Sequence, residues 1–410
     1  MKRSVTVLVI SILSFFSLKG QTQAEFNNLL NQINSDSIRQ TIVDLASFNN
    51  RFCDRTVIGN RQVAQYLVQR LKNYGIDNAR IDSFHYVGNT WLTGDLNRYF
   101  YNVIGRIPGS ASTDTTYIIG AHLDAISLDD NWQHTLTAPG ADDNASGCAI
   151  FIEMARIFHA NNLTPKFNID FMGWDAEEIG LIGSYSDAAD RATAGEVGKT
   201  FILNNDMVSN QPSDTTYIVD LYRYDNSIDF YNIGTDILET YTSIVPIFPD
   251  DNSTMRQYTD SWAYNQSGFN AIFAIEHFFT DYYHTELDLP ASLNFDYAKE
   301  IAKYNFGMLY HYNIHDVFNL DTSNVNVNQS DLSGISLYPN PTIGEVNINN
   351  KEDITIHQIF VFDLSGRLME KFTPASNENV QFSLNHLNSG VYIIKINTSQ
   401  GEIFRKMIKK

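Results

Sequence analysis

The sequence has few basic residues, and beyond its N-terminal segment it has no long apolar run. Its 28 lysines and arginines stand against 47 aspartates and glutamates in 410 residues, so the formal net charge is -19. This balance argues against nucleic acid as a partner, because there is no basic surplus to neutralise phosphates. A membrane-spanning helix needs about 20 mostly apolar residues, so we expect no transmembrane segment in the mature protein. The hydrophobic fraction of 43% is still ample for a packed core.

Cysteine is also scarce, because only Cys53 and Cys148 are present. In an oxidising compartment these two thiols have the chemistry to form one disulfide. Cys148, on a predicted helix, equally fits a small buried apolar residue. The sequence leaves both interpretations open.

Residues 1–23 have the features of a secretory signal peptide. Lys2 and Arg3 precede an apolar run over residues 5–18, and small and polar residues follow it. No lipid-accepting cysteine follows the run, which argues against a lipoprotein. We therefore expect an exported protein that is secreted or held at the cell surface.

Residues 24–318 alternate between helical and strand patterns. Apolar residues recur at helical spacing over residues 35–49, 59–74 and 149–159. Short apolar or alternating runs predict strands at residues 80–86, 99–107, 116–124, 167–174, 200–206 and 271–275. Strands that alternate with helices predict an α/β fold, here a mixed sheet with a parallel core flanked by helices.

Acidic and imidazole side chains follow the predicted strands at their carboxyl ends, which is where function gathers in such sheets. These residues are His122, Asp124, Glu177, Glu178, Asp206 and His284. Imidazole nitrogen and carboxylate oxygen both suit zinc. Taken singly, each residue has a structural explanation; the Glu177 and Glu178 pair, for example, would complement a helix dipole. Their joint occurrence at strand ends favours a metal site.

The turn over residues 139–147 carries two adjacent carboxylates among small residues. A carboxylate has two oxygens and is able to bridge two cations, and we expect Asp142 to be that bridge. The alternative is a solvated acidic loop in which Asn144 or Ser146 caps the following helix.

Together, these motifs resemble the M28 zinc aminopeptidases, in the same order along the chain. The resemblance rests on residues 120–124, 139–147, 175–184, 205–207 and 284–285. It implies two Zn²⁺ ions per chain and peptide substrates with a free N-terminus. By motif position, the implied metal ligands are His122, Asp142, Glu178, Asp206 and His284. One ion would be held by His122 and Asp206, and the other by Glu178 and His284, with Asp142 between them. Asp124 would orient His122, and Glu177 would be the general base toward a metal-activated water.

The chain departs from the family at residues 259–262, Thr-Asp-Ser-Trp, where many relatives carry Ser-Asp-His. A contact in the substrate pocket is therefore expected to differ. Aromatic residues near the site, including Tyr258 and Trp262, hint at an apolar or aromatic first side chain of the substrate. His277 lies close to His284 in sequence but lacks the following threonine, so we assign it no metal.

Two other functions fit parts of this pattern. A glutaminyl-peptide cyclotransferase-like enzyme shares the expected fold but needs only one zinc. A non-catalytic surface binding protein would keep the fold without the chemistry. The complete set of expected ligands argues against both.

A change of composition after Phe318 marks a second part of the chain. Residues 319–333 are rich in Asn, Asp and Ser and predict a linker. Residues 334–410 contain short alternating strands separated by turns, which predict a small C-terminal β-sandwich. Residues 337–342, 361–367, 389–392 and 406–410 resemble the C-terminal sorting domain of the type IX secretion system in Bacteroidetes. This resemblance implies export through the periplasm and outer membrane by that machinery. A carbohydrate-binding or spacer domain is the alternative.

Overall fold

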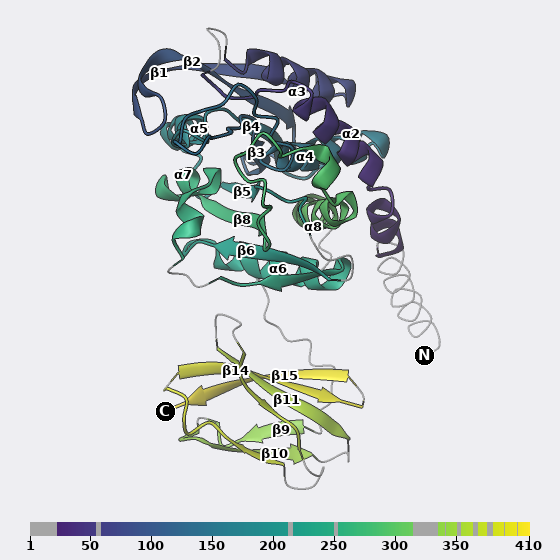
Figure 1. Ribbon diagram of the computed structural model, residues 1–410. Coiled ribbons are helices and arrows are strands. Elements are labelled where there is room, and N and C mark those ends of the chain that lie inside the picture. Colours follow the sequence, from purple (N-terminus) through teal and green to yellow (C-terminus); the bar gives the residue numbers. More distant parts are fainter. Residues whose placement is uncertain are drawn as a thin grey trace, which may run out of the picture. The chain divides into compact units, whose positions relative to one another are not determined.

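The computed structural model describes two compact units, Met1–Phe318 and Asn319–Lys410 (Figure 1). The described residues are 23–314, apart from 55–58, 212–215 and 250–252, and 335–410, apart from 341, 351–353, 364–367, 375–379, 389 and 400. The predicted linker, residues 319–333, and the predicted signal peptide up to residue 22 lie outside them.

The first unit is built on an eight-stranded mixed sheet. Its strands are β1 (Arg80–Thr90), β2 (Gly94–Ile107), β3 (Thr116–His122), β4 (Asn168–Trp174), β5 (Thr200–Asn205), β6 (Tyr217–Arg223), β7 (Ile244–Ile247) and β8 (Asn270–Glu276). They lie in the order β1-β2-β4-β3-β5-β8-β6-β7. Within this order β4, β3, β5 and β8 are mutually parallel, and β1 and β2 pair antiparallel with their neighbours. Strand β6 pairs antiparallel with β8 and parallel with β7. The expected mixed sheet with a parallel core is confirmed.

Helices cover both faces of this sheet (Figure 1). They are α2 (Ser35–Ala46), α3 (Arg61–Asn73), α4 (Ala145–Ala160), α5 (Ile182–Thr193), α6 (Ile228–Tyr241), α7 (Asp260–Gln266) and α8 (Phe295–Asn313), with short 3-10 helices η1 (Thr254–Gln257) and η2 (Pro290–Ser292). Helices α2, α3, α4, α6 and α8 share one large apolar core, whereas α5 and α7 pack with the other face.

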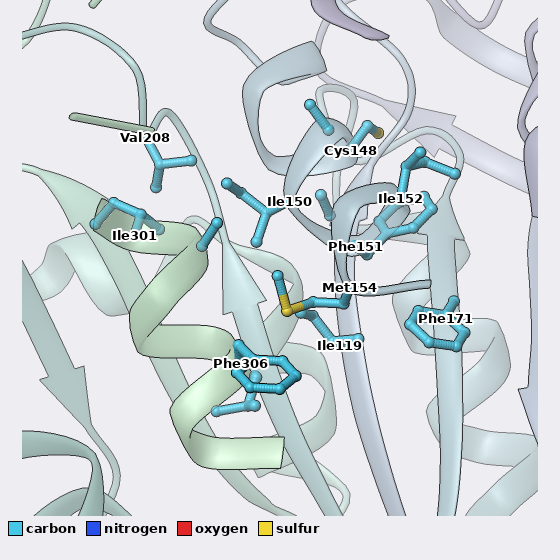
Figure 2. Close-up of a cluster of buried hydrophobic side chains, with 14 of the residues drawn as sticks. Ile119, Cys148, Ile150, Phe151, Ile152, Met154, Phe171, Val208, Ile301 and Phe306 are labelled. Atoms are coloured by element: carbon cyan, nitrogen blue, oxygen red, sulfur yellow. The ribbon is translucent and has the colours of Figure 1, made fainter. Parts of the chain in front are cut away.

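Helix α4 is the centre of the larger core (Figure 2). It follows the acidic turn, and the side chain of its N-cap, Asn144, accepts a hydrogen bond from the Gly147 backbone at 2.9 Å. Its apolar residues are buried all round, as expected of a helix between a sheet and other helices. Gly147 permits this packing, because a Cβ there would lie 2.3 Å from the Asn205 carbonyl oxygen.

The two cysteines are free thiols in this structure, and both are buried. Cys148 lies on α4 among apolar neighbours, where its sulfur approaches the His122 carbonyl at 3.2 Å. It therefore fits the buried apolar interpretation.

The second unit consists of two antiparallel sheets around a separate core. One sheet has the order β13-β10-β9 and the other β12-β11-β14-β15. The strands are β9 (Ile335–Tyr338), β10 (Glu345–Asn350), β11 (Ile356–Asp363), β12 (Leu368–Phe372), β13 (Gln381–Ser383), β14 (Gly390–Thr398) and β15 (Gly401–Lys409). Residues from both sheets meet in the core; the rings of Phe372 and Phe382, for example, lie 5.0 Å apart.

Within the part of the chain that the structure describes, no helix is both long enough and apolar enough to traverse a bilayer.

Candidate active site

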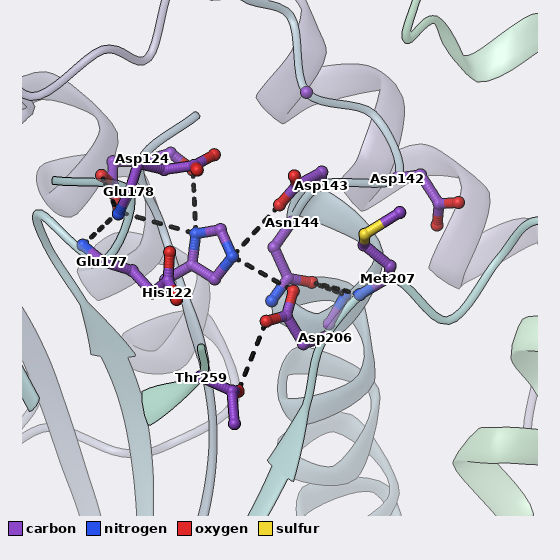
Figure 3. A network of polar contacts seen from close by, with 12 residues as sticks. His122, Asp124, Asp142, Asp143, Asn144, Glu177, Glu178, Asp206, Met207 and Thr259 are labelled. Carbon is purple, nitrogen blue, oxygen red and sulfur yellow. Dashed lines mark hydrogen bonds and ion pairs between the residues drawn. The ribbon is translucent and has the colours of Figure 1, made fainter. Parts of the chain in front are cut away.

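The side chains that the sequence analysis singled out gather at the carboxyl edge of the parallel strands (Figure 3). His122 is the last residue of β3, and Asp206 directly follows β5. Glu177 and Glu178 lie just beyond β4, and His284 lies in the segment after β8. Because the carboxyl ends of parallel strands share one edge, residues that are far apart in sequence meet there.

His122 contacts carboxylates from three segments of the chain. Its Nε2 lies 3.1 Å from Asp206 Oδ1 and 3.2 Å from Asp143 Oδ1. Its Nδ1 faces Asp124, at 3.2 Å from the backbone carbonyl oxygen and 3.6 Å from Oδ1. One edge of the ring therefore faces the site, while Asp124 lies behind the other edge, as expected for a residue that orients the imidazole.

His284 makes a second, similar set of contacts. Its Nε2 lies 3.0 Å from Glu178 Oε2 and 3.1 Å from Asp143 Oδ2. Asp143 thus presents one oxygen to each histidine. In each set, His122–Asp143–Asp206 and Asp143–Glu178–His284, the three ligand atoms lie within 4.8 Å of one another.

This geometry corrects the expected position of Asp142. The residue between the two histidines is its neighbour, Asp143. Asp142 is buried on the other side of the turn, where its Oδ1 accepts a hydrogen bond from the Ser209 backbone at 3.0 Å. Successive side chains of the turn point in different directions, and the sequence offered no signal for choosing between two adjacent aspartates.

Two residues that the sequence analysis missed hold this turn in place. Arg51 is completely buried, and its guanidinium donates hydrogen bonds to the carbonyl oxygens of Leu123, Pro139 and Gly140. Asp288 accepts the backbone N–H groups of Asp142 and Asp143 at 2.9 and 3.1 Å. Asp288 could have been suspected from the sequence, because it lies four residues after His284. No sequence pattern pointed to Arg51, because it lies in a segment that carries none of the site motifs.

The two adjacent glutamates differ in their surroundings. Glu178 Oε2 contacts His284, while its Oε1 accepts a hydrogen bond from the Ile126 backbone at 3.2 Å. Glu177 belongs to neither ligand set, and its side chain lines the cavity. Asp124 accepts the backbone N–H groups of both glutamates, at 3.0 and 3.3 Å, and so fixes their directions relative to His122.

Burial and neighbouring charges shift the pKa values of these groups strongly. Burial raises the pKa of Glu177 well above its ordinary value, and Glu178 adds to this effect while His122 opposes it. Burial disfavours a charged Asp143, but its hydrogen bonds with His122 and His284 outweigh burial and lower its pKa. For His284, burial is outweighed by Glu178 and Asp143, which raise the pKa to about 10.

These donor sets fit divalent cations. Imidazole nitrogen with carboxylate oxygen is a donor set that zinc accepts. Three buried or half-buried donors converge in each set, and a cation would balance the excess of carboxylates. A carboxylate shared by two ions is typical of sites in which the metals lie about 3.5 to 4 Å apart.

The site lies in a cavity of about 780 Å³ that also has many apolar and aromatic walls. Its lining residues besides the two ligand sets include Trp91, Trp132, Glu177, Leu181, Tyr185, Met207, Met255, Tyr258, Trp262, Phe273, Ile275, Phe279 and Tyr283.

Several residues at the site have an unusual backbone conformation. Positive φ angles, between 53° and 62°, occur at Ala176, Leu181, Met207 and His284. Such conformations are uncommon outside glycine and cluster at functional sites.

The remaining candidate residues have other surroundings. Thr259 Oγ1 contacts Asp206 Oδ2 at 3.4 Å, and Trp262 lines the cavity. Residues 259–262, where the sequence differs from the family pattern, therefore do reach the site. His277 pairs with Asp220 at 2.7 Å and belongs to neither ligand set. His311 is buried on α8.

An α/β sheet with imidazoles and carboxylates at the ends of its parallel strands is typical of metal-dependent hydrolases. The profile of peptidase family M28 matches residues 102–309, half of the chain, and the chain belongs to this family. The expected enzyme class, a zinc-dependent aminopeptidase, is thereby confirmed at the level of the family. A second profile, the secretion system C-terminal sorting domain, matches residues 336–410 and indicates export.

Individual relatives agree with this assignment. Leucine aminopeptidase 1 of Trichoderma harzianum is 28% identical over 328 residues, which cover 73% of this chain and 75% of the relative. The LapA aminopeptidase of Legionella pneumophila has a similar structure, with a TM-score of 0.56, 22% identity and coverage of 71% and 74%. The glutaminyl cyclase of Bacteroides thetaiotaomicron bound to N-acetylhistamine has a TM-score of 0.53, 18% identity and coverage of 68% and 98%. These two structures share the fold.

Proposed function

We propose that the chain is a secreted aminopeptidase that holds two zinc ions and removes the first residue of peptides with a free N-terminus. The observation that carries this proposal is the position of Asp143, whose two oxygens each face a different histidine. His122 and Asp206 would hold one ion, Glu178 and His284 the other, and Asp143 would be shared. When bound, such a pair of ions lowers the pKa of a coordinated water and polarises the scissile carbonyl.

Glu177 is the proposed general base. Its side chain faces the cavity while its backbone is fixed by Asp124. Its carboxylate belongs to neither ligand set, so it is available to take a proton from the attacking water. The same carboxyl group can then pass the proton to the leaving amine. Asp124 acts as a positioning residue, because it contacts both His122 and the Glu177 backbone.

The cavity also supports a preference for the substrate's first side chain. Met207, Phe273 and Ile275 form one of its walls and belong to a small apolar cluster beside Asp206. The side chain of an apolar first residue such as leucine would pack against this wall. The curated relatives, leucine aminopeptidases, support the same preference.

Substitution of Glu177 tests this function. We expect Glu177→Gln to abolish hydrolysis of leucine anilide, because the amide cannot accept the proton, while zinc content stays near that of the parent. Glu239→Gln, on the exposed face of α6, serves as the matched control and should keep full activity. An active Glu177→Gln variant would refute the assignment of the base.

A glutaminyl cyclase is the second candidate, because one of the similar solved structures has that function. Elemental analysis separates the two possibilities. A single zinc per chain, together with cyclisation of peptides that begin with glutamine, would favour the cyclase; two zinc ions with release of N-terminal leucine would favour the aminopeptidase.

We further propose that residues 334–410 carry the protein through the periplasm and across the outer membrane by the type IX secretion machinery. The sorting-domain match supports this route.

A further inference from the structure

The cavity has two unlike walls. Met207, Phe273 and Ile275 are almost fully buried and close it beside Asp206. Trp91 and Trp132 line it elsewhere, with 57% and 69% of their surface exposed. The chain has only four tryptophans, and three of them line this one cavity.

Trp91 is hydrogen-bonded to the backbone of a proposed metal ligand, Glu178. It lies in the turn between β1 and β2, and its indole Nε1–H donates a hydrogen bond to the Glu178 carbonyl oxygen at 3.0 Å. The carboxylate of that same Glu178 contacts His284. The hydrogen bond fixes the edge of the indole beside the proposed second ion and leaves much of the ring exposed.

Trp132 is presented by a braced loop that is also attached to His284. The backbone N–H of Leu128 donates to the His284 carbonyl oxygen at 2.9 Å. Asp129 Oδ1 accepts the backbone N–H groups of Asn131 and Gln133, at 2.8 and 2.9 Å. Within this loop Trp132 has a φ of 59°, in a region that bulky residues rarely adopt. Strain of this kind is concentrated at functional sites, and here it holds an exposed indole at the cavity.

Both tryptophans are therefore tied to the Glu178–His284 half of the site, whereas the closed apolar wall lies beside Asp206. An enzyme that takes the end of a peptide places the first side chain in a closed space, and the rest of the chain must leave through an open side. Rigid aromatic side chains bind ligands with little loss of conformational entropy. We propose that Trp91 and Trp132 form a second subsite, the tryptophan rim, which binds an aromatic side chain at the second position of the peptide.

This inference rests on the proposed aminopeptidase function and deepens it. It predicts that the enzyme distinguishes oligopeptides by residues beyond the one that it removes. The relevant quantity is the ratio of kcat/KM for Leu-Phe-Ala to that for Leu-Gly-Ala. Both peptides offer the same first residue, so only the downstream contact differs.

We expect the zinc-loaded wild type to favour Leu-Phe-Ala. In the Trp91→Ala, Trp132→Ala double variant this ratio should fall about tenfold, in line with an aromatic contact worth about one factor of ten. Trp91→Phe keeps an aromatic ring but loses the Nε1–H donor. Its ratio should lie between that of Trp91→Ala and that of the wild type. Val87→Ala is the matched control, because Val87 is exposed on the same hairpin but does not line the cavity. Its ratio should equal that of the wild type.

Binding is measured separately by calorimetric titration of zinc-loaded Glu177→Gln protein with the same two peptides. If neither peptide is hydrolysed by the wild type, the aminopeptidase function fails, while the titrations still test the rim. Tighter binding of Leu-Phe-Ala that disappears in the double tryptophan variant supports the subsite. An unchanged ratio in both kinetics and titration, or an equal loss for the two peptides, would overturn it.

Discussion

Asp142 and Asp143 are adjacent in the sequence, but only Asp143 is a proposed metal ligand. The matched substitutions Asp143→Asn and Asp142→Asn make the same chemical change one residue apart. An asparagine keeps the size of aspartate but offers a single carbonyl oxygen and no charge. At position 143 it is unable to face both His122 and His284, which lie 3.2 and 3.1 Å from different oxygens of the native carboxylate.

The size of the effect follows from the ligand sets. Each proposed ion has three protein ligands, and Asp143 is the one that they share. Loss of a residue that only supports a ligand typically lowers metal affinity by about 10- to 100-fold. Loss of the shared ligand should lower the affinity by more than about 100-fold for each ion, or about 2.8 kcal/mol at 1.4 kcal/mol per factor of ten.

At position 142 the expected effect on zinc is small. An amide oxygen still accepts the hydrogen bond from Ser209, and Asp142 Oδ1 makes no contact with either histidine. Burial already raises the pKa of Asp142 to about 6, so the site favours a neutral side chain more than an exposed position would. We expect zinc affinity to change by less than about tenfold, since the group does not coordinate the metal.

The assay is elemental analysis after dialysis against buffered zinc, with melting curves to confirm that both variants are folded. About two zinc ions per chain should remain in Asp142→Asn and close to none in Asp143→Asn. The reverse result, with zinc lost from Asp142→Asn and retained by Asp143→Asn, would refute the assignment of the shared ligand.

Two further outcomes are expected. The pKa of His284, raised to about 10 by Glu178 and Asp143 against the effect of burial, exceeds its ordinary value of 6.5; its protonation therefore stabilises the metal-free fold fully below about pH 6.5, and Tm of the chelated protein should fall as pH rises toward about 10. A flat Tm over this window would contradict the proposed contacts. Removal of residues 319–410 should leave an active enzyme in the periplasm, as measured by cell fractionation and anilide hydrolysis, because the first unit has its own core. Appearance of the truncated protein in the medium would rule out the export role of the C-terminal unit.

Much of the sheet was predictable from local patterns. The four parallel strands β3, β4, β5 and β8 are short apolar runs that end in polar residues, and all four were expected. Strands β6 and β7, which complete one side of the sheet, were not identified, and neither were helices α5, α6, α7 and α8. Helix α4 begins at Ala145, earlier than the expected residue 149, because Asn144 caps it and small residues are accommodated in its first turn.

The sequence by itself determined which kinds of side chain end each strand, and that was sufficient to indicate a metal site and its family. Only the tertiary structure decided which of two adjacent aspartates faces the histidines. That direction depends on the backbone of the turn, which is held by Arg51 and by Asp288 from segments far away along the chain. Contacts of this kind have no local sequence pattern. The rim of Trp91 and Trp132 is likewise visible only once the hairpin and the loop are folded against Glu178 and His284.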